Sequence, residues 1–164
     1  MGGGLGLGAV QETVKTLLNS THNLQIIAVA GKNVRLYNQL LKISTKNSNL
    51  HVYGYIENIV EHMSAADLIV TKPGGLTTAE VLAKKLPMVI VDPLPGQEYR
   101  NTEFLLNWGL AVKVGGRSSL SALINHLLDN SLRMRQMKEM AAYLGKPDAA
   151  EKITDFVINL MQQK

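Results

Sequence analysis

The chain has 164 residues, of which 46% are hydrophobic and 18% charged, and this size and balance are typical of one globular domain with its own core. It has no cysteine, which excludes disulfides and cysteine-ligated zinc, and no apolar run approaches the roughly 18 residues that span a bilayer. The formal charge is +4, and all five charged side chains between positions 13 and 56 are basic, which predicts an electropositive face without selecting a partner.

Short β-branched runs alternate with amphipathic runs along the first two thirds of the chain. The runs that predict strands occupy 24–30, 49–55, 67–72, 87–92 and 110–114. Helical spacing of apolar residues falls between them at 10–18, 37–41 and 104–108, and the apolar stripes at 120–128, 137–144 and 153–161 predict core-facing helices. The alternation predicts a Rossmann-like, doubly wound α/β domain with a parallel sheet, whose ligand lies at the carboxyl ends of the strands.

A glycine-rich segment, GGGLGLG at 2–8, opens the chain and is typical of a turn between a strand and a helix. Because no strand precedes it, we expect 1–164 to be a single domain of a longer protein. Residues 4–9 formally match the dinucleotide fingerprint, but no acidic residue between Glu12 and Glu57 could hold an adenosine ribose. A loop that faces a sugar phosphate, or a hinge, fits the segment better.

The sharpest motif is TKPGGLTTAE at 71–80, which follows a predicted strand and leads into a helix. Gly74 and Gly75 let the main chain approach an anion, and the helix that follows presents unpaired N–H groups, so the motif predicts a phosphate site. A tight turn with a capping box, in which Thr77 and Glu80 satisfy those N–H groups, is the alternative.

Two further loops follow neighbouring predicted strands. Gln97, Glu98 and Asn101 supply the amides and carboxylate that suit sugar hydroxyls, although a proline-braced turn explains the same segment. Tyr55 and Ile56, next to Gly54, could receive a flat base, although a tyrosine at a strand end also serves packing. The doubly wound geometry brings all three loops to one crevice, which strengthens the reading of each as part of a ligand site.

Other catalytic arrangements are missing from the sequence. The four histidines show no metal-ligand spacing, and there is neither a Gly-x-Ser-x-Gly elbow nor an Asp-x-Asp pair. We therefore expect no metal and no cofactor, and the helix that starts at Gly75 would have to neutralise a diphosphate.

Taken together, TKPGGLTTAE, the later PLPGQEYRN, the upstream GYIENI and the initial GGGLGLG resemble the C-terminal, donor-binding half of the diacylglycerol glycosyltransferases. That group includes monogalactosyldiacylglycerol synthase and processive diacylglycerol glucosyltransferase, and it is similar to the peptidoglycan lipid-linked N-acetylglucosaminyltransferase. The resemblance covers essentially the whole chain. It implies the second Rossmann-like domain of a GT-B enzyme, without the acceptor domain.

The resemblance also implies roles for individual residues, with UDP-glucose or UDP-galactose as the donor. The uracil would lie at Gly54, Tyr55 and Ile56, and the ribose at Glu80. The remaining groups would hold the diphosphate (Gly74, Gly75, Leu76, Thr77), the hexose (Gln97, Glu98, with Asn101 nearby) and the edge of the donor or acceptor cleft (Gly3, Gly4, Gly6).

By the same resemblance, the whole enzyme would be an inverting hexosyltransferase that makes membrane glycolipid. It would be cytoplasmic and peripheral on the inner face of the membrane, with a lipid acceptor and catalytic base reached through the other domain, no nucleic acid as partner and a possible homo-oligomer. The isolated chain would bind UDP-hexose and transfer nothing. A peptidoglycan-type UDP-N-acetylglucosamine transferase, a nicotinamide-dependent oxidoreductase domain and a basic surface module for anionic lipid or nucleic acid remain the alternatives.

Overall fold

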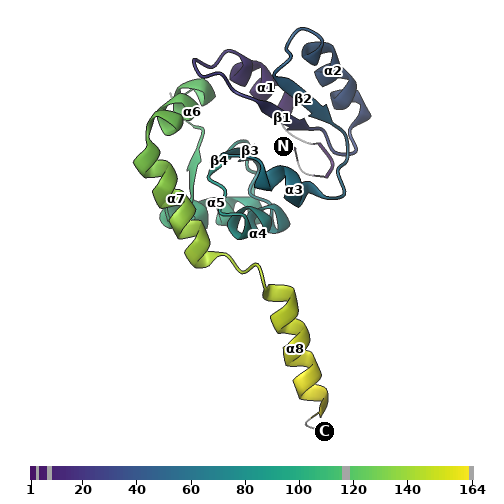
Figure 1. The fold of residues 1–164 in the computed structure, drawn as a ribbon, viewed down its shortest axis with the longest axis vertical. Helices are drawn as coiled ribbons and strands as arrows, with labels where there is room; N and C mark the ends of the chain where they lie inside the picture. The colour runs from purple at the N-terminus through teal and green to yellow at the C-terminus, as the bar shows by residue number, and fades with distance from the viewer. Residues whose placement is uncertain (3, 7–8, 116–118, 163–164) are drawn as a thin grey trace.

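The computed structural model describes residues 1–2, 4–6, 9–115 and 119–162, with parallel strands flanked by helices (Figure 1). Each predicted strand is present, although shorter than its apolar run, and the short helix α3 was not predicted. The strands are β1 (Ile26–Val29), β2 (Leu50–Tyr53), β3 (Ile69–Thr71), β4 (Met88–Ile90) and β5 (Ala111–Lys113). The helices are α1 (Val10–Leu18), α2 (Val34–Ser44), α3 (Ile59–Ser64), α4 (Gly75–Ala83), α5 (Gln97–Asn107), α6 (Leu120–Asp129), α7 (Ser131–Leu144) and α8 (Ala149–Gln162).

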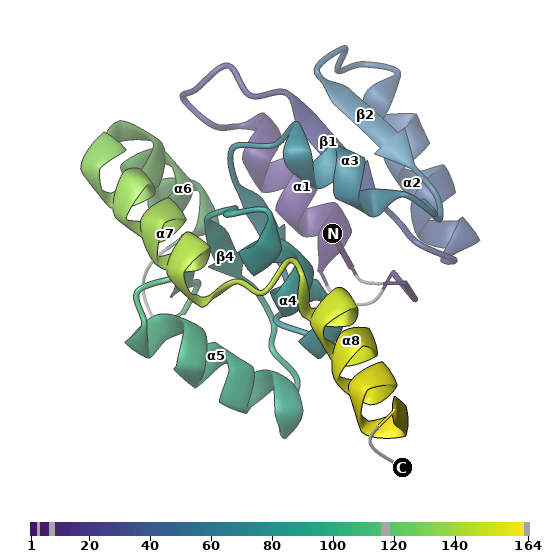
Figure 2. The same ribbon diagram turned by 60° about the horizontal axis from the view of Figure 1, so that its bottom comes forward.

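The α/β class is confirmed, but the described strands form two sheets rather than one. β1 pairs with β2 in one parallel sheet, and β3, β4 and β5 form the other, in that order and also parallel. The edges of β1 and β3 face each other without a ladder between them, and the N-terminus lies in this region (Figures 1 and 2). The single doubly wound sheet expected from the sequence is therefore interrupted between β1 and β3.

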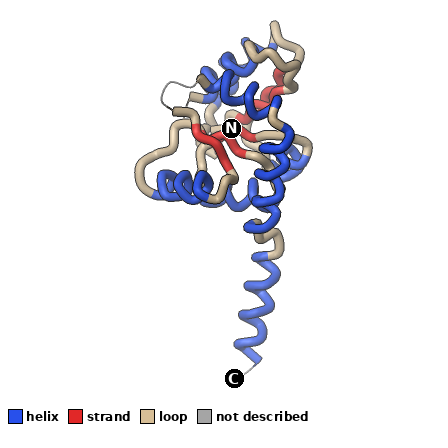
Figure 3. Tube along the Cα trace, turned by 90° about the vertical axis from the view of Figure 1, so that its left-hand side faces the viewer, coloured by secondary structure: helices blue, strands red, loops and turns tan. Residues whose placement is uncertain are grey.

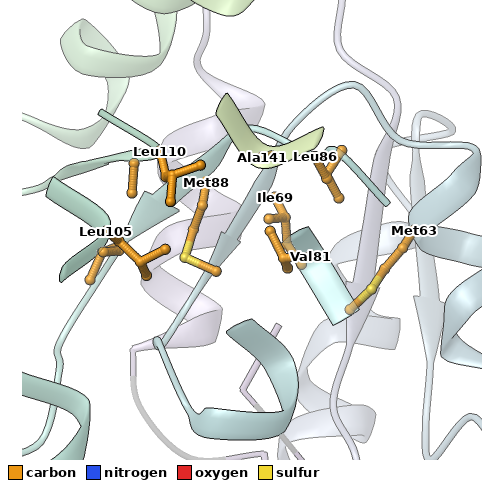
Figure 4. Close-up of a cluster of buried hydrophobic side chains, with 10 residues drawn as sticks. Met63, Ile69, Val81, Leu86, Met88, Leu105, Leu110 and Ala141 are labelled. Atoms are coloured by element: carbon orange, nitrogen blue, oxygen red, sulfur yellow. The ribbon is translucent and has the colours of Figure 1, made fainter. Parts of the chain in front are cut away.

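The three-stranded sheet is the middle of three layers. All three residues of β4 have no exposed surface, and alternation sends Met88 and Ile90 to one face and Val89 to the other. Met88 and Ile90 pack with Leu105 of α5 in the cluster drawn in Figure 4. On the opposite face, Val89 packs in a cluster with residues of α6 and α7. Burial on both faces is what a β-branched run without polar alternation predicts for a central parallel strand.

The two-stranded sheet has a core of its own. Leu36 and Leu40 of α2 pack with Val14 of α1 and with Ile26 and Leu50 of the strands. Asn33 begins α2, because its side-chain oxygen accepts a hydrogen bond from the Leu36 N–H at 2.9 Å.

Helix α8 departs from the sequence expectation. Its apolar stripe was expected to join the core, but no residue of α8 is buried, and the helix stands away from the body of the molecule (Figures 1 and 3). The five stripe residues are all exposed: Ile153, Phe156, Val157, Leu160 and Met161. An amphipathic stripe becomes buried only where it packs against another element. Helices α6 and α7 pack on the body, whereas α8 follows them and does not. Among the described helices, none combines the length and the apolar character needed to cross a bilayer.

Candidate functional site

The three loops singled out in the sequence lie on one rim, because they follow the carboxyl ends of parallel strands. Residues 54–56 follow β2, 72–74 follow β3 and 91–96 follow β4. A fourth loop at the same rim, 30–33, follows β1. The rule that ligands bind at the carboxyl ends of parallel strands therefore still points to these loops, although the strands form two sheets.

The start of α4 is open to an incoming anion. Gly74 is its N-cap, in an extended conformation with φ −63° and ψ 152°, and no side chain caps this end. The first helical hydrogen bond there runs from the Thr78 N–H to the Gly74 carbonyl, at 2.8 Å. The capping box considered for Thr77 and Glu80 does not form. The first N–H groups of α4 thus point out of an exposed turn at the positive end of the helix dipole.

The first turns of α5 contact the start of α4 and the residue before it. A Cβ placed on Gly75 would come within 3.0 Å of Nε2 of Gln97, so the Gln97 amide reaches across the helix start because no side chain is in its way. The Asn101 amide donates a hydrogen bond of 2.8 Å to the Pro73 carbonyl. Residues expected to hold a diphosphate and residues expected to hold a hexose are thus in contact with each other.

Glu98 is half-buried in the first turn of α5 and has a partner in the loop before that helix. Its Oε2 atom accepts a hydrogen bond of 2.7 Å from the Leu94 N–H, which holds the loop against its own helix. The loop turns sharply on both sides of this bond, since Gly96 has φ 99° and Asp92 has φ 42°. One carboxylate oxygen of Glu98 is committed to the loop, which leaves the other for a ligand.

The loop after β2 presents an aromatic ring with a cation above it. Tyr55 is 57% exposed, and Nζ of Lys32, in the loop after β1, lies 5.2 Å from the centroid of the ring. Ile56 beside it is half-buried. Lys32 was considered only as part of a basic stretch, although its position directly after a predicted strand could have placed it at the rim.

The N-terminal glycine segment spans the rim between the two sheets. The Met1 amine donates to the Val70 carbonyl at 2.8 Å, and the Lys32 N–H donates to the Gly4 carbonyl at 2.9 Å. Gly6 has φ +60°, and a Cβ on it would lie 2.0 Å from the Ala30 carbonyl oxygen, so only glycine fits there. Gly3 lies outside the described residues. The described part of the loop contacts the residues after β1 and β3, and its place at the edge of a donor or acceptor cleft stays a prediction.

Leu76 and Glu80 lie on α4, and among the described residues no side-chain hydrogen bond is found for Glu80. Leu76 is 83% exposed at the helix start, and Glu80 is half-buried one turn further on. Across the part of the chain that the structure describes, no group of three or more His, Asp or Glu side chains could hold a metal ion. Positive charge at the carboxyl ends of the strands is present at the α4 terminus and on Lys32, Lys72 and Lys113.

Comparison with curated proteins finds relatives along nearly the whole chain. A processive diacylglycerol beta-glucosyltransferase of Bacillus cereus (strain AH187) is 36% identical over 153 residues, which is 93% of this chain and 39% of that protein. The enzyme of the same name from Bacillus mycoides (strain KBAB4) is 35% identical over the same share of each chain. The chain therefore spans about two fifths of the length of these relatives.

Solved structures agree with this fold. A crystal structure of Acinetobacter baumannii MurG superposes with a TM-score of 0.67 at 26% identity, over 100% of this chain and 49% of that one. The glycotransferase of kitacinnamycin superposes with a TM-score of 0.60 at 18% identity, over 91% of this chain and 40% of that one. The family model described as the glycosyltransferase family 28 C-terminal domain matches residues 2–153. On this match and on the relatives above, the chain belongs to the glycosyltransferase family 28 C-terminal domain family.

Proposed function

We propose that this chain is the donor-binding half of a hexosyltransferase that moves glucose or galactose from UDP to diacylglycerol, making membrane glycolipid. The observation that carries the proposal is the uncapped start of α4 with the Gln97 amide lying across Gly75. A diphosphate and the sugar attached to it are adjacent in the donor, and the two groups of residues suited to them are adjacent here. The names of the Bacillus relatives support the acceptor and the type of sugar.

The donor would lie along the rim in the order of the loops. Tyr55 and Ile56 would hold the uracil, with Lys32 over one face of the Tyr55 ring, and Glu80 would accept hydrogen bonds from the ribose hydroxyls. The N–H groups of Gly75, Leu76 and Thr77 would hold the diphosphate, with Gly74 allowing its close approach.

The hexose would lie on the α5 side of the crevice. Gln97 and the free oxygen of Glu98 would hold its hydroxyls, and Asn101 keeps the two loops together through Pro73. An amide both donates and accepts hydrogen bonds, whereas a carboxylate only accepts, so this pair satisfies a polyol of either epimer.

The reaction proposed for the whole enzyme is a displacement at the anomeric carbon. The bond from this carbon to the diphosphate oxygen breaks, and its electron pair passes to the leaving UDP. The acceptor hydroxyl forms the new bond from the opposite side and gives its proton to a base in the other domain. This chain contributes the stabilisation of the leaving charge by main-chain N–H groups and the α4 dipole, with no metal in that role.

We propose that the isolated chain binds the donor but does not transfer the sugar, and that the whole enzyme works at the membrane surface.

Calorimetric titration of the purified chain with UDP, UDP-glucose, UDP-galactose, UDP-N-acetylglucosamine and NAD tests the proposal. The variant Gly75→Asp places a carboxylate where the diphosphate would lie and moves the Gln97 amide aside, because a Cβ there would lie 3.0 Å from its Nε2 atom. An acid in the first helical turn nevertheless stabilises the helix. We expect the variant to reduce UDP affinity by at least about tenfold, which corresponds to roughly 1.4 kcal/mol, without lowering the melting temperature. Ser131→Asp adds the same charge at the exposed start of α7 and should leave UDP binding unchanged.

The titration also distinguishes the proposed donor from the alternative ligands. Tighter binding of UDP-N-acetylglucosamine than of either hexose donor would favour the peptidoglycan type of donor, and binding of NAD without UDP would contradict the proposal. Addition of a metal chelator should leave UDP affinity unchanged, because the leaving charge is assigned to the α4 terminus. A loss of binding on chelation would show that a metal takes part.

A further inference from the structure

The turn between β1 and α2 contacts two other parts of the rim. The Ala30 N–H donates a hydrogen bond of 2.9 Å to the Tyr53 carbonyl, at the end of β2. The Lys32 N–H donates one of the same length to the Gly4 carbonyl, in the N-terminal glycine segment. The Lys32 ammonium group also lies over the Tyr55 ring, in the loop after β2. The turn therefore links the glycine segment to the loop after β2.

Asn33, the last residue of this turn, uses both ends of its side-chain amide. Its Oδ1 atom accepts a hydrogen bond of 2.9 Å from the Leu36 N–H, which caps the start of α2. Its Nδ2 atom donates a hydrogen bond of 3.2 Å to the Gly6 carbonyl, and both bonds are partly buried. A helix cap of this kind needs only the acceptor, which serine, threonine or aspartate also provides. The donor half of the Asn33 amide is therefore not needed for the cap and serves the contact with Gly6.

Gly6 lies against the turn with little clearance. A Cβ on Gly6 would lie 2.0 Å from the Ala30 carbonyl oxygen and 2.7 Å from Cβ of Asn33. The main chain of the glycine segment is thus in direct contact with the turn, and the Asn33 amide adds a directed bond to that contact. A displacement of Gly6 away from the turn would stretch this bond together with the neighbouring bond from Lys32 to Gly4.

The start of α7 has the same kind of cap without a contact to a second segment. Oδ1 of Asn130 accepts a hydrogen bond of 2.9 Å from the Arg133 N–H. Within the part of the chain that the structure describes, no hydrogen bond from Nδ2 of Asn130 is found. Asn33 and Asn130 therefore form a matched pair that differs in the bond to the glycine segment.

We propose that Asn33 is a positioning residue for the donor, because its Nδ2 atom holds the glycine segment at the rim and with it the turn that places Lys32 over Tyr55. This step rests on the proposed function, in which the uracil lies at Tyr55. Asn33 acts through these two segments rather than by touching the donor. Release of the Gly6 carbonyl gives both segments more freedom before binding, and the loss of that freedom on binding lowers the affinity.

The variant Asn33→Ser tests the proposal, because serine retains the acceptor of the cap, adds no charge and lacks the amide donor. Asn130→Ser makes the same change at the start of α7 and is the control. Amide hydrogen exchange is measured at Lys32 and at Leu36, whose N–H groups donate to the glycine segment and to the cap respectively. UDP affinity and melting temperature are measured on the same proteins.

We expect Asn33→Ser to speed exchange at Lys32 by on the order of tenfold and to leave exchange at Leu36 unchanged. UDP binding should weaken by roughly threefold to tenfold, which is the range that the loss of one hydrogen bond corresponds to. Asn130→Ser should change neither exchange at Lys32 nor UDP affinity. The melting temperatures of the two variants should lie within a few degrees of each other, so a difference in UDP affinity is not a difference in stability.

Unchanged exchange at Lys32 in Asn33→Ser would overturn the proposal. Faster exchange at Lys32 and Leu36 alike would also overturn it, because Asn33 would then act as a helix cap alone. Faster exchange at Lys32 with unchanged UDP affinity would overturn the role in donor binding. Absence of UDP binding by the unmodified chain would contradict the proposed function and with it that role, whereas faster exchange at Lys32 alone would still support the hold of Asn33 on the glycine segment.

Discussion

The two sheets of this molecule are built alike but stabilised to different degrees. β4 has neighbours on both edges and apolar clusters on both faces, whereas β1 has a ladder on one edge and a cavity on the other. The halves are joined by the Met1 and Gly4 hydrogen bonds and by α1 against α6, where Ser20 donates to Asn125 at 2.6 Å. Side chains and one loop, rather than a strand ladder, set the position of the loop after β2 relative to the loop after β3.

The largest difference should appear when a central side chain is removed from each half. Met88→Ala empties a site with no exposed surface in the three-stranded sheet and should lower the free energy of unfolding by about 3 kcal/mol, with loss of protection in both sheets. Leu40→Ala removes an equally buried side chain from the other half and should expose β1 and β2 amides first. Hydrogen exchange resolved by residue measures this, and identical exchange patterns for the two variants would show a single cooperative unit.

The Met1 amine, which donates a hydrogen bond to the Val70 carbonyl, makes the free energy of unfolding sensitive to pH. Burial lowers its pKa from 8.0 to about 6. Between those values the unfolded chain binds a proton that the folded chain does not, so the free energy of unfolding should rise with pH from about 6 to 8, by about 2 to 3 kcal/mol at most. Denaturant unfolding of the free and the N-acetylated chain measures it, since acetylation removes the amine. The same slope for both forms would assign the pH dependence to other groups.

A smaller loss of stability is expected from two hydrogen bonds, only one of which lies at the proposed sugar site. Asn101→Ala removes the hydrogen bond to Pro73, and Asn49→Ala removes one of similar length, 2.9 Å, to Leu24 in the other half. Each should cost about 1 kcal/mol of folding free energy. Only Asn101→Ala should weaken binding of UDP-glucose more than binding of UDP. Calorimetry with both ligands gives the comparison, and equal losses for UDP and UDP-glucose would place Asn101 outside the sugar site.

The smallest effect concerns the contact between α1 and α6. The hydrogen bond from Ser20 to Asn125 is partly buried, and Ser20→Ala should lower the free energy of unfolding by about 0.5 to 1 kcal/mol. A double-mutant cycle with Asn125→Ala isolates the pair from the bond that Ser20 also accepts from the His22 N–H. A coupling energy near zero would mean that the packing of Leu17 against the α6 cluster, rather than this hydrogen bond, stabilises the contact between α1 and α6.

The residue pattern over short stretches of the sequence was sufficient to predict many elements of this molecule. The β-branched runs at 26–29 and 88–90 and the glycine pair before α4 each follow from residue chemistry over a few positions, and each is present as expected. The uncapped start of α4 was one of two alternatives, because Thr77 and Glu80 have the spacing of a capping box that the helix does not use. Lys32 was missed because its contact with Tyr55 joins loops after two different strands.

The sequence by itself determined the α/β class, the order of the strands and which loops follow them, since periodicity and turn chemistry act over a few residues. The short helix α3 is the element that this pattern did not predict. Only the tertiary structure decided that β1 and β3 stay apart, that Gln97 lies across Gly75 and that α8 leaves its apolar stripe exposed. These features depend on which surfaces find partners, and an amphipathic helix or an open strand edge carries the same local signal whether or not it is covered.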